Sequence, residues 1–277
     1  MYRMRRNCLV VVALGVSSLW VCGREGLAGP FKDKQLEAAV RDVLREPKAD
    51  LSDDKLKNVY DLEADVKHIH DLTGLEKCKN LLQLKLAKND IADLKPLKEL
   101  INLQSLDLAN NKISDVSPLA GLTKLQYLQL ENNQIAKVDD LKALTSLSAL
   151  YLSGNKIHDV KPLSSLTRLS SLYLGHNEIK DISMLNQVTR IMTLDLSENQ
   201  IADLTPLTKQ TDLNLLMAQK NKITDLTPLV NWAKADSEGP RRFAPFLRLY
   251  LDGNPLSDDA KTKQLDALKK YGVRIEK

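Results

Sequence analysis

The chain has 277 residues, of which 43% are hydrophobic but only 4% are Phe, Trp or Tyr, and 52 are leucines. This aliphatic content and a charged fraction of 27% exclude a disordered or collagen-like chain and predict a globular or solenoidal protein with a leucine core. Its three cysteines include no CxxC pair and no Cys/His cluster with zinc-ligand spacing, so they predict neither a disulfide-stapled miniprotein nor a zinc site.

Residues 1–28 have the pattern of a secretory signal peptide, because three early arginines precede an uncharged, largely apolar stretch over residues 7–23. That stretch is shorter than the roughly 20 residues that a membrane-spanning helix needs, so we expect cleavage after Ala28 and no membrane span afterwards. The four residues that end at Cys22 resemble a bacterial lipoprotein box, but the bulky Val21 argues against lipidation. The sequence predicts a secreted or periplasmic protein of the cell envelope.

The leader also explains most of the net charge. Residues 1–28 contain four arginines and one glutamate, so their removal lowers the formal net charge from +4 to +1. The remaining chain has no Lys/Arg stripe and no nucleic-acid-binding motif, and we expect no nucleic-acid partner. Only Cys78 is left among the cysteines, so the exported protein must be stable by packing alone.

Residues 29–58 are predicted to form an amino-terminal cap. Leu36, Val40 and Leu44 recur at helical spacing within residues 32–44, which predicts one amphipathic helix there.

A 22-residue repeat follows, with the pattern LxxLxLxxNxIxDLxPLxxLxx. A period of this size indicates a stack of identical supersecondary units. Seven units are well preserved, and worn copies begin at Val59 and Phe246, so nine units cover residues 59–256. The well-preserved units begin at Leu81, Leu103, Leu125, Leu147, Leu169, Ile191 and Leu213.

The spacing within the repeat predicts what each position does. Leucines at positions 4 and 6 lie two apart and therefore face the same side of a short strand. The asparagine at position 9 falls where the chain leaves the strand, and its amide can bond backbone groups of its own turn and of the next. These structural asparagines are Asn89, Asn111, Asn133, Asn155, Asn177, Asn199, Asn221 and Asn254.

Aspartate at position 13 and proline three residues later predict a capped helical turn. The carboxylate can accept unpaired N–H groups at the start of the turn, and the proline there sacrifices no hydrogen bond. The aspartates lack the neighbouring oxygen ligands of a calcium loop, so we interpret them as structural. They are Asp71, Asp93, Asp115, Asp159, Asp181, Asp203 and Asp225.

On these repeats the chain resembles bacterial leucine-rich-repeat proteins of the internalin type, whose units share this asparagine and this Asp-x-x-Pro-Leu turn. The resemblance covers residues 59–256. It implies an α/β solenoid, a right-handed leucine-rich-repeat superhelix with short parallel strands on the concave face. The convex face is expected to carry 3-10 or irregular turns, and both ends helical caps.

Positions 3 and 5 of each unit are expected to point outward from the concave sheet. They include four of the seven tyrosines of the chain, together with residue types that dominate interface energetics. The predicted partner-binding residues are Tyr127, Tyr151, Tyr173, Asp195, Leu215, Met217, Arg248 and Tyr250.

An alternative stays open for the tyrosines, which also suit a sheet because they pack on each other across adjacent strands. For Tyr127 the two interpretations are balanced. Leu215, Met217 and Tyr250 favour binding, because apolar side chains gain nothing from exposure to water.

The array is interrupted by eleven extra residues, 235–245, whose composition predicts a loop. This insertion is either neutral or, through Arg241, Arg242 and Phe243, an extension of the contact surface. Residues 257–277 are predicted to form a carboxy-terminal cap with a helix over 257–270.

No motif for catalysis, nucleotide binding or metal binding is found in the sequence, so we expect no enzyme activity, cofactor or metal. His68, His70, His158 and His176 fall in turns and are interpreted as solvated.

The sequence therefore predicts an exported, non-catalytic module that binds a protein on its concave sheet. Internalins are adhesins that bind host receptors, but the resemblance is to the repeat, so host invasion is not expected to carry over. Two alternatives stay open. One is a glycan or envelope-polymer binder, because tyrosines also stack on sugars, and the other is a cytosolic scaffold similar to leucine-rich phosphatase regulators.

Overall fold

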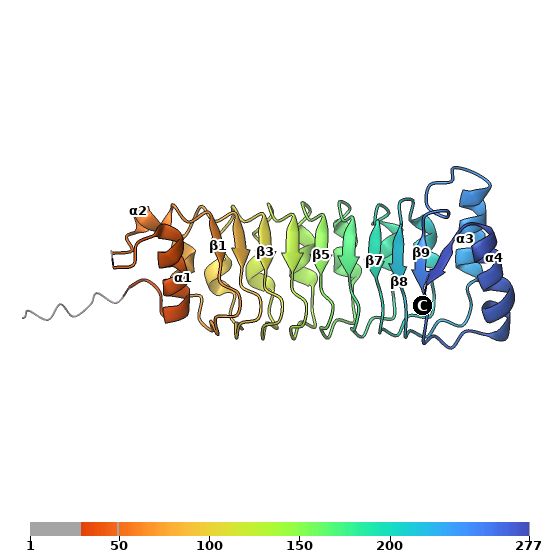
Figure 1. Cartoon of the computed structure of the whole chain (residues 1–277), viewed down its shortest axis with the longest axis horizontal. Coiled ribbons are helices and arrows are strands. Elements are labelled where there is room, and N and C mark those ends of the chain that lie inside the picture. Colours follow the sequence, from red (N-terminus) through yellow and green to blue (C-terminus); the bar gives the residue numbers. More distant parts are fainter. Residues whose placement is uncertain (1–28, 49, 277) are drawn as a thin grey trace, which may run out of the picture.

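The computed structural model describes residues 29–48 and 50–276, so the predicted leader, its cleavage after Ala28 and Cys22 lie outside the described residues. Ten parallel strands, β1 to β10, follow one another in sequence order within a single open sheet (Figure 1). This arrangement confirms the predicted leucine-rich-repeat solenoid.

Each strand is three residues long and pairs with the next in a register of one repeat. Leu106 is aligned with Leu128, and Leu128 with Leu150, so equivalent leucines form a column. The strands are β1 Asp61–Glu63, β2 Gln83–Lys85, β3 Ser105–Asp107, β4 Tyr127–Gln129, β5 Ala149–Tyr151, β6 Ser171–Tyr173, β7 Thr193–Asp195, β8 Leu215–Met217, β9 Arg248–Tyr250 and β10 Arg274–Glu276.

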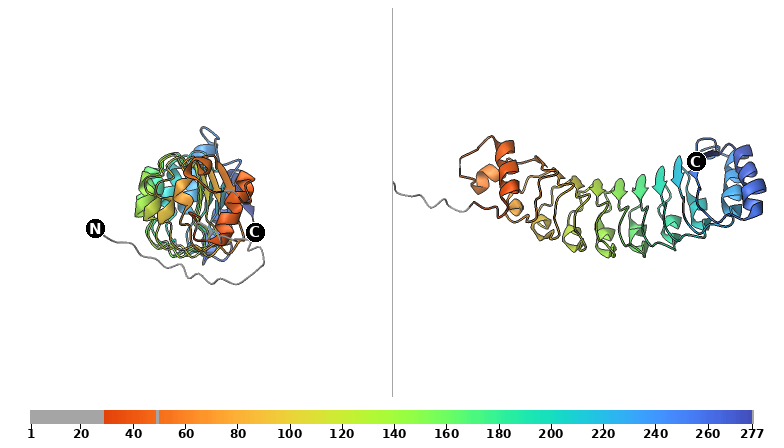
Figure 2. Two further views of the ribbon diagram at one scale, coloured as in Figure 1. Left: turned by 90° about the vertical axis from the view of Figure 1, so that its left-hand side faces the viewer. Right: turned by 60° about the horizontal axis from the view of Figure 1, so that its bottom comes forward.

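The sheet lines the inner side of a curved molecule, and short helical turns lie on the outer side (Figure 2). Adjacent strands lie closer together than adjacent helical turns can pack with their side chains, so the stack bends toward the sheet. The outer turns are the 3-10 segments η1 Leu75–Lys77, η2 Lys95–Leu97, η3 Ser117–Leu119, η4 Asp139–Ala143, η5 Lys161–Ser165, η6 Ser183–Asn186 and η7 Thr205–Lys209.

The core between strand and turn is aliphatic. In the coil formed by residues 125–146, seven side chains at the pattern positions have no solvent exposure. Burial of about seven such side chains cannot offset the entropy of ordering 22 residues, so each coil depends on its neighbours. The seven are Leu125, Leu128, Leu130, Ile135, Val138, Leu141 and Leu144.

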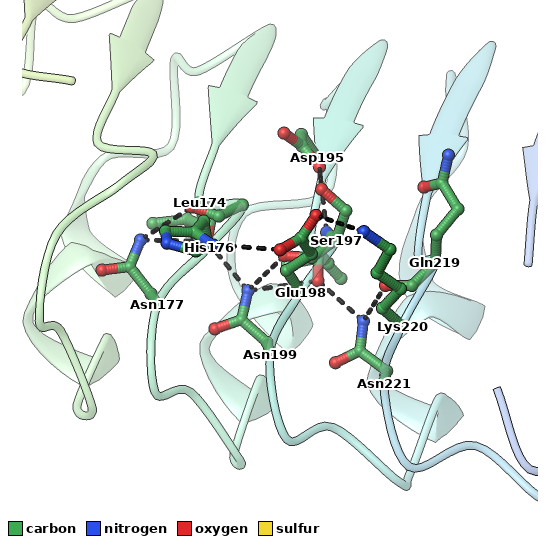
Figure 3. Close-up of polar contacts among 12 residues, drawn as sticks. Leu174, His176, Asn177, Asp195, Ser197, Glu198, Asn199, Gln219, Lys220 and Asn221 are labelled. Carbon is green, nitrogen blue, oxygen red and sulfur yellow. Dashed lines mark hydrogen bonds and ion pairs between the residues drawn. The ribbon is translucent and has the colours of Figure 1, made fainter. Parts of the chain in front are cut away.

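The position-9 asparagines form a row beneath the sheet, and Figure 3 shows Asn177, Asn199 and Asn221 at the same place in successive coils. In the central coil the Asn155 amide nitrogen donates to the carbonyls of Leu130 at 3.0 Å and Leu152 at 2.9 Å. Its oxygen accepts the N–H of Ile135 at 3.0 Å. Each asparagine therefore bonds backbone groups of its own coil and of the preceding coil, whereas bonds to the following coil were expected from the sequence.

The position-13 aspartates stand ahead of the outer turns. The carboxylate of Asp115 accepts the N–H of Ser117 at 2.9 Å, and Asp181 bonds Ser183 in the same way at 2.8 Å. These hydrogen bonds with Ser117 and Ser183 lower the pKa of the two carboxyl groups.

Helices close both ends of the stack (Figure 1). The amino-terminal helices are α1 Lys34–Leu44, capped by the Asp33 carboxylate, and α2 Asp53–Leu56. At the other end a π-helical turn, Ala260–Gln264, runs into α4 Leu265–Lys270, and the chain then adds β10 beside β9. The repeat pattern does not predict β10, which lies beyond its last unit. Within the described residues no helix is long and apolar enough to cross a bilayer.

Most of the insertion, residues 238–245, consists of turns and bends, as its composition predicted, but its first three residues belong to a helix. Helix α3, Thr227–Ser237, replaces the outer turn of its coil and extends into the inserted segment. Phe243 is only 3% exposed, because its ring stacks on Trp232 with 3.7 Å between centroids. Burial of this ring folds the segment back onto the end of the array, so little of the Phe243 side chain is left exposed.

The last unit also departs from its predicted start. Phe246 was placed at the buried first position, but it is 60% exposed, and Leu247 is buried in its place. The N–H of Leu247 bonds the carbonyl of Phe243 at 2.9 Å, so a helical turn at the end of the insertion shifts the buried side by one residue.

Candidate functional site

The concave sheet presents two columns of side chains, from positions 3 and 5, with the buried leucine of position 4 between them. All eight residues singled out in the sequence lie in these columns, on strands β4 to β9. Arg248 is exposed and the other seven are half-buried. We call these eight residues the concave strip.

Three tyrosines of the strip pack against one another, the first pair tilted at 47° and the second pair stacked. The rings of Tyr127 and Tyr151 have centroids 5.3 Å apart, and those of Tyr151 and Tyr173 are 4.7 Å apart and nearly parallel. Such pairs contribute roughly 0.5–1.5 kcal/mol beyond the area they bury. The packing role that the sequence left open is therefore present, and the three side chains stay half-buried on the concave face.

The hydroxyl groups of Tyr127 and Tyr173 stay protonated over the physiological range. Burial, with smaller contributions from Tyr151 and nearby carboxylates, raises the pKa of Tyr127 to about 12. Burial also raises the pKa of Tyr173. The Tyr127 hydroxyl donates to Gln129 on the same strand. Both phenols can thus serve as neutral hydrogen-bond partners.

Asp195 is held rigidly at the next strand. Its carboxylate accepts hydrogen bonds from the N–H of Ser197 at 2.9 Å and from the Ser197 hydroxyl at 2.6 Å (Figure 3). A Cβ atom on Gly175 would lie 2.5 Å from the other oxygen of Asp195, so glycine is needed there for the carboxylate to occupy its place. The position-7 glycine in this coil is explained by this close approach.

Two further carboxyl groups, Asp107 and Glu131, lie on the same face and are partly removed from water. Desolvation raises the pKa of both. Glu131 also accepts from the Gln129 amide at 3.1 Å and is repelled by Asp195 and Asp107. The middle of the concave surface is therefore acidic and would gain from contact with a cation.

Neutralising Asp107 should stabilise the protein at neutral pH. A raised pKa means that the folded state binds the proton more tightly than the unfolded state, so ionisation of Asp107 costs stability as the pH rises through its pKa. Asp107→Asn should raise the free energy of unfolding by about 0.5 kcal/mol at pH 7, with no gain well below pH 3.8, the ordinary pKa of the group. Thermal unfolding from pH 3 to pH 7 measures this difference.

The matched control has the opposite sign. Because the pKa of Asp115 is lowered, its stabilising effect is present at neutral pH and is lost as the pH falls through the folded-state value. Asp115→Asn should therefore destabilise at pH 7. A loss of stability at pH 7 in both variants would contradict the assignment of Asp107.

The carboxy-terminal part of the strip combines apolar side chains with one guanidinium group. Leu215 and Met217 are half-buried, as the tyrosines and Asp195 are. Arg248 donates to Glu276 of β10 at 3.0 Å and to the Tyr250 hydroxyl at 2.7 Å, and it lies over the Tyr250 ring. The strip therefore ends in an ordered corner built around one guanidinium group.

The sequence analysis missed three residues that shape this surface. Glu131 and Glu276 add carboxylates, and Met192 at position 2 is 47% exposed beside β7. The repeat could have shown Met192, because the other well-preserved units carry a leucine or a polar residue at position 2. No repeat signal marks Glu276, since β10 lies beyond the array.

Groups with reactive chemistry are sparse. Within the part of the chain that the structure describes, no group of three or more His, Cys, Asp or Glu side chains is placed to hold a metal ion. The side chains of His68, His70 and His176 are at least 72% exposed. Cys78 is buried in the core, and this burial raises the pKa of its thiol to about 12. A thiol of this kind is a poor nucleophile at neutral pH.

The chain matches a family described as leucine-rich repeats (two copies), once over residues 101–143 and again over residues 145–187. No sequence among the curated proteins matches the chain.

Solved structures match more of the chain. Internalin InlF from Listeria monocytogenes is 30% identical, with a TM-score of 0.69, and the match covers 91% of this chain and 78% of that one. Internalin C2 from the same organism is 28% identical, with a TM-score of 0.68, over 82% and 95% of the two chains. A leucine-rich-repeat protein of Leptospira interrogans is similar in fold, with 21% identity, a TM-score of 0.68 and coverage of 80% and 62%.

Proposed function

Because the chain belongs to the internalin family of bacterial leucine-rich-repeat proteins, we propose that it is an exported, non-catalytic recognition protein that binds another protein with its concave sheet. The concave strip supports this proposal. It combines tyrosine, methionine and arginine side chains, which are enriched in protein interfaces, on one rigid surface that the core does not require.

The surface is also ordered before any partner binds. Asp195 is fixed by Ser197, Arg248 by Glu276, and the tyrosines by their stack. A preorganised surface loses little side-chain entropy on association, so more of its contact energy appears as affinity. Its acidic centre suits a partner that presents lysine or arginine there.

Glycan binding is the second candidate, and the tyrosine stack argues against it. A sugar stacks on an open ring face, but Tyr151 has Tyr127 on one side and Tyr173 on the other. Glycan arrays that gave saturable binding would favour the alternative.

Ser171→Arg should block partner binding without unfolding the protein. Ser171 lies at position 3 of β6, half-exposed on the concave face beside the tyrosine stack and away from the core. A long charged side chain there would obstruct the surface, and we expect at least a tenfold loss of affinity, or about 1.4 kcal/mol. The measurement is capture of proteins from cell-surface extracts on the immobilised wild type and variant, with quantitative mass spectrometry.

Ser117→Arg is the matched control, because it makes the same substitution on the outer turn η3. The proposal requires at least one protein that wild type and Ser117→Arg retain equally and that Ser171→Arg loses. If every captured protein stays bound to Ser171→Arg, the concave sheet is not the binding surface.

Export gives a separate expectation. A mature protein that starts at Gly29 would have lost the 28 leader residues, and intact-mass spectrometry of protein from the native host measures this directly. A lipid on Cys22 would instead indicate a membrane-anchored form. An intact leader on protein from the cytosol would favour the scaffold alternative.

A further inference from the structure

A hollow of about 530 Å³ lies where strands β6, β7 and β8 begin, at one margin of the concave sheet. Three arginines line it. Arg168 and Arg190 occupy the same position in successive coils, 22 residues apart, and Arg242 comes from the insertion. Residues far apart in sequence therefore bring three guanidinium groups to one place.

The charges of the hollow are only partly balanced. Arg242 donates to Asp212 at 2.8 Å, and Asp212 is the one acidic residue among those lining the hollow. Arg168 and Arg190 are exposed and make no hydrogen bond or ion pair with any described residue. Two guanidinium groups in adjacent coils are thus free to bind an anion, while the middle of the same sheet is acidic.

We propose that this hollow binds acidic side chains of a protein partner, which extends the proposed function and rests on it. Guanidinium groups pair with carboxylates through two parallel hydrogen bonds, and a pair of arginines one repeat apart can take carboxylates on neighbouring residues of an extended segment. The exposed side chain of Met192 lies among them and offers apolar contact, a combination typical of protein interfaces.

A second hollow favours a polypeptide over a free anion. It has a volume of about 280 Å³ and shares Arg242 with the first, but Ala235, Pro240 and the Trp232–Phe243 pair make its walls largely apolar. A segment with an acidic residue next to an apolar one would use both hollows. Inorganic phosphate or a sulfated sugar would use only the first.

The basic margin and the acidic centre of the concave sheet also fix the orientation of a partner. A partner would place acidic residues at the hollow and basic residues over Asp195 and Glu131, so the reversed orientation would bring like charges together.

The test uses a fluorescein-labelled peptide of six glutamates and fluorescence anisotropy at low ionic strength. The double variant Arg168→Gln with Arg190→Gln should bind the peptide at least tenfold more weakly than wild type. Both side chains are exposed and unpaired, so the variant should keep the thermal stability of wild type.

The control is Lys98→Gln with Lys142→Gln, which removes the same charge from exposed sites at the outer turns η2 and η4. It should bind the peptide as wild type does. Equal weakening in the two double variants would mean that only net charge matters, and unchanged binding in the arginine variant would equally overturn the proposal.

Competition separates the sources of negative charge. Millimolar inorganic phosphate should leave the peptide bound, whereas displacement by phosphate, or tighter binding of a heparin oligosaccharide than of the peptide, would assign the hollow to another ligand. These measurements need no natural partner. If the arginine variant binds the peptide as wild type does, but Ser171→Arg still loses a captured protein, the hollow is not a binding site and the concave sheet still is.

Discussion

Asn155→Ala should lower the free energy of unfolding by about 3 kcal/mol. Asn155 is 8% exposed and is the hydrogen-bond partner of the Ile135 N–H, so the substitution leaves this buried donor unpaired. It also removes one of the two amide donors from each of the carbonyls of Leu130 and Leu152, which keep those of Asn133 and Asn177. An unpaired buried donor costs roughly 1–3 kcal/mol, and each of the two lost hydrogen bonds to the carbonyls costs about 0.5–1.5 kcal/mol. Urea unfolding followed by circular dichroism measures the loss.

Asn231→Ala is the control, because Asn231 is exposed on α3 and its side chain makes no hydrogen bond among the described residues. Alanine suits a helix interior better, so this variant should be as stable as wild type or slightly more stable. If the two alanine variants unfolded at the same urea concentration, the asparagine row would be an incidental feature of the turns.

Asp236→Ala should cost about 3 kcal/mol and release the insertion from the end of the array. Its buried carboxylate accepts the N–H groups of Arg242 at 2.9 Å, Phe243 at 3.2 Å and Ala244 at 2.9 Å. Loss of these charge-assisted bonds leaves buried donors unpaired, and Phe243 would then separate from Trp232.

Tryptophan fluorescence reports this change, because Trp232 is the only tryptophan once residues 1–28 are removed. We expect a red-shifted emission in Asp236→Ala and weaker binding of the glutamate peptide, since Arg242 would move. Glu238→Ala, at an exposed carboxylate on the same segment, should change neither. A wild-type emission spectrum in Asp236→Ala would show that the carboxylate does not organise the insertion.

The repeat made most of the fold predictable, because each position has the same physical role in every coil. Leu128 and Leu150 were expected to point inward, and both are fully buried. Asp115 was expected to accept N–H groups ahead of its turn, and it bonds Ser117. These interactions lie within a coil or between adjacent coils, so a single repeat contains the information.

The remainder depends on contacts that no repeat position specifies. Phe243 is buried because Trp232, eleven residues earlier, provides a ring to stack on. Arg248 is ordered by Glu276, in a strand that no repeat anticipates. The arginine hollow joins Arg168 and Arg190 to Arg242 across the insertion, and its existence depends on how that segment folds back.

The same limit applied to the concave strip. The sequence placed Tyr127, Tyr151 and Tyr173 on one face correctly, but the strength of their mutual stacking follows from the spacing of the strands and the side-chain rotamers. Consequently, the tyrosines have a structural role as well as the proposed role in binding. Ser171 lies on the same face but takes no part in the ring packing, so its substitution tests binding without disturbing that packing.

Site-specific photocrosslinking tests directly whether the concave sheet binds a protein partner. A benzophenone-bearing phenylalanine replaces Tyr173 on the concave sheet in one protein and Lys142 on the outer turn η4 in another. Both are exposed to cell-surface extracts and irradiated, and the crosslinked proteins are identified by mass spectrometry. We expect a discrete partner crosslinked from position 173 and absent from position 142. The same partner crosslinked only from position 142 would show that the concave sheet is not the binding surface.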